Sequence, residues 1–299
     1  MTDATKTAGV GWPLRDAVRA SLARRRIRAV ARGAGDGLAL DPMDVGIDVP
    51  GLLLEETREL GPGSPVLVRI VRALEHSGGA AAVVDGLFAP EPFRRERSAR
   101  LAGAIRSERL VPWLAPLLSA RELSVRQAAA RALGRIGGAR AADALLASIQ
   151  RRGPSPRLVI ELARAAPDLY LESCLKSHRR LVTRHAVAIA AGLRRRHTAV
   201  TPLLGLLRAG SKRERVAACR ALGWIAEGSS TRALAAALDD REWRVRASAA
   251  KALLELAEPS VAESLQGCLA DRQPAVRRAA SRALRRMLAR TSGENGGCL

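Results

Sequence analysis

The sequence predicts an all-α fold, a right-handed α-solenoid (α-α superhelix) of about seven to eight short two-helix repeats. Composition is the first reason: hydrophobic residues make up 47% of the 299 residues, but aromatic residues make up only 2%. A core of Ala and Leu suits helices, whose axes pack at about 8–10 Å, better than a sheet, in which β-branched and aromatic side chains are enriched. The second reason is a helical segment that recurs along the chain.

The recurring segment carries Val and Arg near its start and an Ala-Leu pair about two turns later. It is clearest at residues 125–137, 215–227, 245–257 and 276–288. The residue that closes the pair, Leu or in weaker copies Ala, falls at Leu74, Ala102, Leu133, Ala166, Ala191, Leu222, Leu253 and Leu284. A unit of about 31 residues therefore holds two helices and two tight turns. A helix pair this short buries its apolar face only by stacking on its neighbours.

The pattern Asp-x-x-x-x-Val-Arg, followed by an Ala-rich stretch that ends in Ala-Leu, resembles the short HEAT repeats of bacterial proteins, of the phycobilin-lyase-like type. The resemblance covers about residues 64–288. It implies a HEAT-like fold but not a function, because such repeats serve many roles. Residues 150–200 depart from the pattern, since Pro156 and Pro167 bracket a unit without Val-Arg. We expect a bend or a shortened repeat there.

Four parts are expected along the chain. Residues 1–12 are predicted to form a disordered N-terminus, and residues 64–290 the HEAT-repeat solenoid. Between them, residues 13–63 hold a basic helix (13–32) and then an acidic loop that enters a helix near 51–60, interpreted as an N-terminal cap. Residues 291–299 are expected to be a disordered tail.

A helical wheel of the second helix of each unit places one column of positions opposite the core. Seven of its eight members are basic, and only Ile189 is not: Arg72, Arg100, Arg131, Arg164, Arg220, Lys251 and Arg282. In solenoids that this chain resembles the second helix lines the concave surface, so the resemblance implies a ladder of charges with rungs about 10 Å apart. We interpret it either as a docking stripe for an acidic partner or as a solvated face filled with Arg by codon preference. Trp224, one turn beyond Arg220, is interpreted as an exposed anchor of this stripe or as packed against the next helix.

A second column lies beside the seam between repeats: Arg95, Arg126, Arg184, Arg215, Arg246 and Arg277. These side chains are predicted to pair with turn carboxylates such as Asp239, Asp240 or Asp271 and with loop carbonyls. They would then tie neighbouring repeats together.

The net charge of +21 and the pI of about 11.5 favour an acidic partner. We expect a non-enzymatic scaffold that presents its basic concave surface to an acidic protein. The alternatives are sequence-nonspecific nucleic-acid binding along the same stripe, and an adaptor held on an anionic membrane by residues 13–32. We expect a cytoplasmic protein, or one peripheral to the inner membrane, whose membrane anchor would lie upstream of this sequence.

Catalysis finds little support in the sequence. The four His show no HExxH motif. His178 and His185 are seven residues apart and could share a helix face, but the neighbouring Arg179, Arg180 and Arg184 disfavour a metal ion there. No phosphate-binding loop or nucleophile motif is present, so no metal, cofactor or small-molecule substrate is predicted. The resemblance leaves a HEAT-fold lyase or glycosylase as a minor alternative. Cys174, Cys219 and Cys268 are predicted to be small core residues rather than ligands or disulfide partners.

Overall fold

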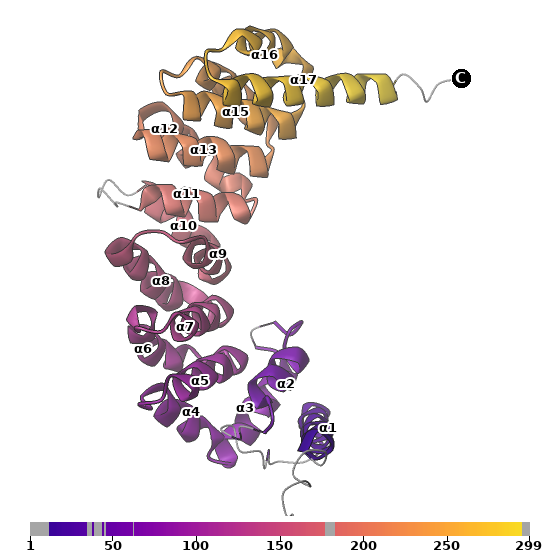
Figure 1. The fold of residues 1–299 in the computed structure, drawn as a ribbon, viewed down its shortest axis with the longest axis vertical. Coiled ribbons are helices and arrows are strands. Elements are labelled where there is room, and N and C mark those ends of the chain that lie inside the picture. The colour runs from indigo at the N-terminus through magenta and orange to yellow at the C-terminus, as the bar shows by residue number, and fades with distance from the viewer. Residues whose placement is uncertain are drawn as a thin grey trace, which may run out of the picture. The chain divides into compact units, whose positions relative to one another are not determined.

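The structure is a computed structural model that describes residues 12–34, 38, 44, 46–61, 63–176 and 183–294. The chain divides into two compact units, Met1–Ser148 and Ile149–Leu299, called here the N-terminal and the C-terminal unit. Every regular element in the described ranges is a helix (Figure 1). The described helices therefore confirm the all-α prediction.

Eight helices coincide with the predicted second helices of the repeats. They are α3 (Pro65–His76), α5 (Pro92–Ile105), α7 (Leu123–Ile136), α9 (Pro156–Ala165), α11 (Arg184–Leu193), α13 (Lys212–Ile225), α15 (Trp243–Leu256) and α17 (Pro274–Glu294). The residues of the recurring slot are buried, except that Leu284 in the last helix is half-buried. Ala166 is buried as well but directly follows α9 as its C-cap. The Ala-Leu slot is thus the core-facing position on which the repeats stack.

Except for α8 (Gly138–Arg152), which has 15 residues, the first helices of the repeats are shorter than the second helices that follow them. They are α4 (Gly79–Leu87), α6 (Val111–Leu114), α8, α10 (Asp168–Lys176), α12 (Val200–Ala209), α14 (Thr231–Ala236) and α16 (Ala262–Gly267). Helix α6 is flanked by 3₁₀ turns at Glu108–Leu110 and Pro116–Ser119, and Pro112 and Pro116 lie in this segment. Proline has no N–H to give to the helical ladder, which explains the interruption of regular α-helix.

Small residues allow successive second helices to approach closely. A Cβ atom added to Gly103 would lie 2.9 Å from the Cα of Ala132 on the next second helix. The same contact recurs at Gly192, 2.5 Å from the Cα of Ala221, and at Gly223, 2.7 Å from the Cα of Ala252. These glycines lie in helices with ordinary backbone angles, so the neighbouring backbone, and not a turn, is what requires them.

The unit expected to be irregular is shortened, as predicted. Helices α9 and α11 have 10 residues each, whereas α13 and α15 have 14. Pro156 opens α9 in the first turn, and the Ser155 side chain caps it by accepting a hydrogen bond from the Leu158 N–H at 3.2 Å. Residues 177–182 lie outside the described residues.

Two further helices precede the repeats. The basic helix α1 (Trp12–Ala31) packs on α3 through a buried face that includes Ala23, Ile27 and Val30. Helix α2 (Val49–Glu56) packs on α1 and α5 (Figure 1). At the other end, α17 continues to Glu294, so four residues of the range expected to be a tail are helical. The expected disordered N-terminus, except Trp12, and residues 295–299 lie outside the described residues.

Candidate functional site

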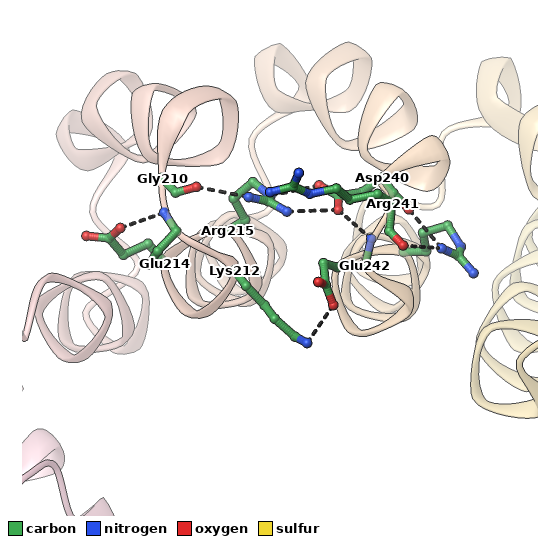
Figure 2. Close-up of polar contacts among 9 residues, drawn as sticks. Gly210, Lys212, Glu214, Arg215, Asp240, Arg241 and Glu242 are labelled. Carbon is green, nitrogen blue, oxygen red and sulfur yellow. Dashed lines mark hydrogen bonds and ion pairs between the residues drawn. The ribbon is translucent and has the colours of Figure 1, made fainter.

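Arg215 on α13 connects the turn before its own helix to the turn of the next repeat (Figure 2). Its Nη1 donates to the carbonyl of Gly210 in its own turn at 3.0 Å. Its Nε and Nη2 donate to the two carboxylate oxygens of Asp240 in the next turn, at 2.8 and 3.0 Å. Asp240 also accepts from the Glu242 N–H at 2.8 Å, which holds the start of α15. The guanidinium group therefore fixes its own turn to the following one.

The same arrangement recurs one repeat later. Arg246 donates through Nε and Nη2 to Asp271 at 2.7 and 3.0 Å, and through Nη1 to the Asp240 carbonyl at 2.8 Å. Asp271 accepts from the Gln273 N–H at 2.7 Å, and Arg277 donates to the Asp271 carbonyl at 2.8 Å. The predicted seam role is confirmed for Arg215 and Arg246, with Asp240 and Asp271 as their partners, whereas no seam arginine pairs with Asp239 in the described residues.

Other members of the seam column make part of this arrangement. Arg95 pairs with Glu122 at 3.1 Å, and Arg184 pairs with Glu214 at 2.8 Å. Arg126 donates only to turn carbonyls, at 2.6 and 2.8 Å. The residue 25 positions beyond it, where Asp240 and Asp271 stand relative to their arginines, is Arg151. The carboxylate half of the contact is thus missing from the sequence at this repeat.

The seam carboxylates are held in their ionised form. Hydrogen bonding from Arg246 lowers the pKa of Asp271, against the opposing effect of burial. Burial alone would raise the pKa of Asp240, but the hydrogen bonds from Arg215 and from the Glu242 N–H lower it overall. Asp240 and Asp271 therefore neutralise Arg215 and Arg246 and are not available to pair with the stripe residues.

In the N-terminal unit the predicted stripe is only partly open. Arg72 and Arg131 are exposed, but Arg100 pairs with Asp48 at 2.8 Å. Asp48 is the N-cap of α2, and Arg97 on the same helix as Arg100 donates to the carbonyls of Asp44 and Ile47. An acidic segment of the chain itself therefore covers the stripe position of α5.

In the C-terminal unit, stripe residues on three successive second helices are exposed: Arg220, Lys251 and Arg282. Among the residues that the structure describes, Lys251 and Arg282 have no ion pair or hydrogen-bonded partner. The Arg220 guanidinium lies over the Trp224 ring at 5.6 Å. Arg164, by contrast, lies 3.3 Å from the buried carboxylate of Glu161 on its own helix.

Three adjoining hollows of about 440, 480 and 330 Å³ run across α11, α13, α15 and α17 of this unit. They share lining residues, so we treat them as one surface and call it the basic groove. Its charged lining comprises seven Lys or Arg side chains and one carboxylate, Glu255: Lys212, Arg213, Arg220, Arg244, Lys251, Arg278 and Arg282. Glu255 itself lies 3.9 Å from Arg286, and Lys212 pairs with Glu242 at 2.5 Å.

Two tryptophans line the central hollow of the basic groove. Trp224 is half-buried, and a Cβ on Gly192 of α11 would lie 3.0 Å from its ring. Trp224 therefore packs against α11 and also lines the basic groove. Trp243 is half-buried too, and the Arg244 guanidinium lies over its ring at 5.0 Å. The floor between the two rings consists of small residues such as Ala247 and Ala252.

Some of these features were not predicted. Arg213, Arg244 and Arg278 lie outside the stripe column and reach the groove because neighbouring helices bring them together. An exposed aromatic pair in the N-terminal unit, Phe88 and Trp113 with ring centroids 5.6 Å apart, was also missed. Arg213 and Arg244 are one repeat length of 31 residues apart, whereas Arg278 and the aromatic pair show no such spacing.

Three of the six arginines of the basic helix α1 pair with acidic residues of the following segment. Arg24 pairs with Glu55 at 2.9 Å and Arg28 with Glu56 at 2.7 Å, and Arg19 pairs with Asp44. These contacts reduce the positive charge that α1 would present to an anionic membrane. None of the helices in the described ranges has the length and apolar content needed to cross a membrane.

The described histidines and cysteines form no metal site. No group of three or more His, Cys, Asp or Glu suited to a metal ion occurs among the described residues. His178 lies outside them, and His185 lines the basic groove, where burial and then Arg213 lower its pKa. Cys219 and Cys268 are buried, as predicted, and Cys174 is half-buried. Burial raises the pKa of the Cys219 thiol to about 12.

Comparison with known proteins supports the repeat assignment. The family model of HEAT repeats matches residues 68–165 and 200–285, more than half of the chain. Human deoxyhypusine hydroxylase is 20% identical over 91% of this chain and 99% of its own, with a TM-score of 0.38. A designed armadillo repeat protein is 17% identical over 69% of this chain and 98% of its own, also with a TM-score of 0.38. No curated protein matches the sequence significantly.

Proposed function

Since the chain belongs to the family of HEAT-repeat proteins, we propose that it is a non-enzymatic scaffold that binds an acidic segment of a partner protein. Stacked helical repeats offer an extended surface suited to protein partners. The basic groove is the observation that supports this proposal most directly. It gathers seven basic side chains around one carboxylate, and two of its rungs, Lys251 and Arg282, have no partner among the described residues.

The arrangement of charge supports a localised site rather than a uniformly basic surface. Arg215 and Arg246 are neutralised by Asp240 and Asp271, and Arg24 and Arg28 of α1 by Glu55 and Glu56. In the C-terminal unit, the basic groove gathers basic side chains from several helices, and Lys251 and Arg282 among them have no partner in the described part of the chain. A carboxylate bound there exchanges water for charge-assisted hydrogen bonds from guanidinium and ammonium groups.

Nucleic-acid binding along the same groove remains the second candidate function, because the net charge of +21 suits any polyanion. The groove offers two indole rings but no Asn or Gln among its lining residues. Phosphate contacts alone would make such binding sequence-independent. The experiment below therefore uses both ligands.

The test compares two triple variants with equal changes in charge. One reverses the groove (Arg220→Glu, Lys251→Glu, Arg282→Glu), and the other reverses exposed arginines away from it (Arg208→Glu, Arg232→Glu, Arg272→Glu). Both should keep the helical circular-dichroism signal of the wild type, since all six side chains are exposed. Binding of a fluorescent twelve-residue peptide rich in Asp and Glu is then measured by anisotropy.

We expect the groove variant to bind the acidic peptide at least about tenfold more weakly and the control variant to lose far less, because close charge pairs contribute more than distant ones. Equal losses in both variants would show that only net charge matters and would refute the proposed site. Duplex DNA is measured beside the peptide. Tighter binding of DNA, with a slope of log K against log salt near −4 to −5 for about five neutralised phosphates, would favour the nucleic-acid function instead.

A further inference from the structure

The spacing of the rungs constrains the ligand of the basic groove. Arg220, Lys251 and Arg282 occupy the same position on α13, α15 and α17, which pack successively side by side. Packed helix axes lie about 8–10 Å apart. The contact between Gly223 and the Ala252 backbone places α13 and α15 toward the close end of that range. The backbone positions of the three rungs therefore follow one another at intervals of about 9 Å along a line that crosses the helices.

Few backbone conformations present acidic side chains at this interval. In a β-strand, residues on one face repeat every second position, at about 6.6 Å, and a step of three residues places side chains on opposite faces. In a polyproline II helix three residues complete a turn with a rise of about 3.1 Å each, so every third side chain points the same way at about 9.3 Å. This repeat matches the rungs.

The surface between the rungs also suits a polyproline II segment. Trp224 and Trp243 border the central hollow, and the floor between them is built from small apolar residues such as Ala247 and Ala252. Proline-rich segments bind in grooves lined by aromatic rings and have little conformational entropy to lose. Arg220 and Arg244 lie over the two rings, which holds each guanidinium group beside an apolar surface.

The row has a fourth position on α11, and this end of the row differs in polarity from the three basic rungs. On α11 the column carries Ile189, which is half-buried and lines the groove together with Val216 and Ala217. An apolar ligand side chain fits at this end, and a carboxylate does not, because it would lose water without gaining a partner.

The chain itself supplies a precedent for the contact. At the equivalent position of the N-terminal unit, Arg100 binds Asp48 at 2.8 Å, and that carboxylate belongs to a segment that lies over α5. A stripe arginine of this protein is thus already seen with a carboxylate from a separate chain segment.

From these observations we infer that the basic groove binds an extended acidic segment in polyproline II conformation, with a carboxylate at every third residue and an apolar side chain one step beyond the acidic run. The pattern is apolar-x-x-acid-x-x-acid-x-x-acid, in which proline is favoured at x. This inference rests on the proposed function, because it specifies the ligand of the same groove.

The test uses two ten-residue peptides of identical composition, LPPEPPEPPE and LPPPEPEPEP, labelled at the N-terminus. Both are proline-rich and carry three glutamates, but only the first places them at every third residue. We expect the first peptide to bind at least about tenfold more tightly, because the second aligns one carboxylate at a time with a rung. Lys251→Ala should remove most of this preference. Arg272→Ala, at an exposed arginine outside the basic groove, should preserve it.

The outcomes separate the inference from the proposed function. Equal binding of the two peptides, still abolished by the groove triple variant, would overturn the spacing and leave the acidic-segment function standing. Absence of binding by either peptide, together with no effect of the triple variant on the Asp- and Glu-rich peptide, would overturn both. Tighter binding of an α-helical peptide with glutamates seven residues apart, about 10.5 Å along a helix, would refute the extended conformation.

Discussion

Arg246 and Lys251 lie on the same helix, α15, but on different sides of it. The Arg246 side chain is 18% exposed and donates to Asp271 and to a turn carbonyl, whereas Lys251 is exposed and faces the basic groove. A difference of five positions, or about 140° around a helix, separates the two environments. Position on the helix, and not residue type, decides whether a basic side chain stabilises the fold or remains available to a partner.

This difference predicts unequal costs of truncation. Arg246→Ala should lower the free energy of unfolding by about 1–3 kcal/mol, because it removes two hydrogen bonds to the part-buried Asp271 carboxylate and one to a turn carbonyl. Lys251→Ala should change it by less than about 0.5 kcal/mol. Urea unfolding followed by circular dichroism measures both. Similar losses at the two positions would contradict the assignment of the seam and stripe columns.

The contribution of the seam also depends on pH. The pKa of Asp271 is lowered in the folded protein, chiefly by Arg246, relative to about 3.9 in an unfolded chain. A carboxylate with a lowered pKa stabilises the fold above its unfolded pKa and loses that contribution as pH falls through its folded pKa. The stability difference between wild type and Arg246→Ala should be constant from about pH 6 to 8 and shrink below about pH 4. A difference that persists at pH 2–3 would show that the aliphatic part of Arg246, and not the ion pair, stabilises the seam.

At the scale of the elements, glycine and alanine set the distance between second helices. Gly192 and Gly223 each face the backbone of an alanine on the following helix, so the stripe positions of these helices lie at the short spacing that the groove requires. The elements before the repeats show a different relation. There Asp48, the N-cap residue of α2, pairs with the stripe residue Arg100. Arg24 and Arg28 of α1 pair with Glu55 and Glu56 of the same acidic segment.

Two glycine-to-alanine variants test the close approach. Gly223→Ala should destabilise the protein by about 1–3 kcal/mol, because its Cβ would meet the Ala252 backbone at 2.7 Å. Gly205→Ala, on α12, has open space around it and should be neutral or stabilising by up to about 1 kcal/mol through helix propensity. Thermal or urea unfolding of both variants decides the matter, and a stabilising Gly223→Ala would disprove the tight packing of α13 on α15.

At the scale of the whole molecule, stability is distributed over neighbouring repeats. In the C-terminal unit, the second helices α11, α13, α15 and α17 pack chiefly on one another in succession and on the first helices of their repeats. The chain also divides into two compact units, each with its own buried residues. Such arrays behave as a sum of repeat and interface terms, so damage to one interface opens its neighbours before distant repeats.

This view predicts a localised response to Gly223→Ala. Amide hydrogen exchange under native conditions should rise in α13 and α15, and less in α11 and α17, while α5 and α7 in the N-terminal unit keep the protection of the wild type. Exchange mapped by mass spectrometry measures this, with Gly205→Ala as the control. An equal rise in α5 and α7 would mean that the two units unfold as one cooperative body.

The sequence was sufficient to predict the eight second helices, their core-facing slot, and the pairing of Arg215 and Arg246 with Asp240 and Asp271. These features repeat at nearly constant spacing, and each depends on residues within one repeat or its neighbour, as Arg246 and Asp271 do. Which stripe residues are paired with another part of the chain depends on the tertiary structure. Arg100 has the same position as Lys251, yet it is bound by Asp48, 52 residues away, while Lys251 has no partner among the described residues. The lining of the basic groove was decided in the same way, because Arg213, Arg244 and Arg278 meet only when separate helices pack. Helical periodicity fixes the direction of a side chain from its own helix, but what occupies that direction depends on chain segments far away in the sequence.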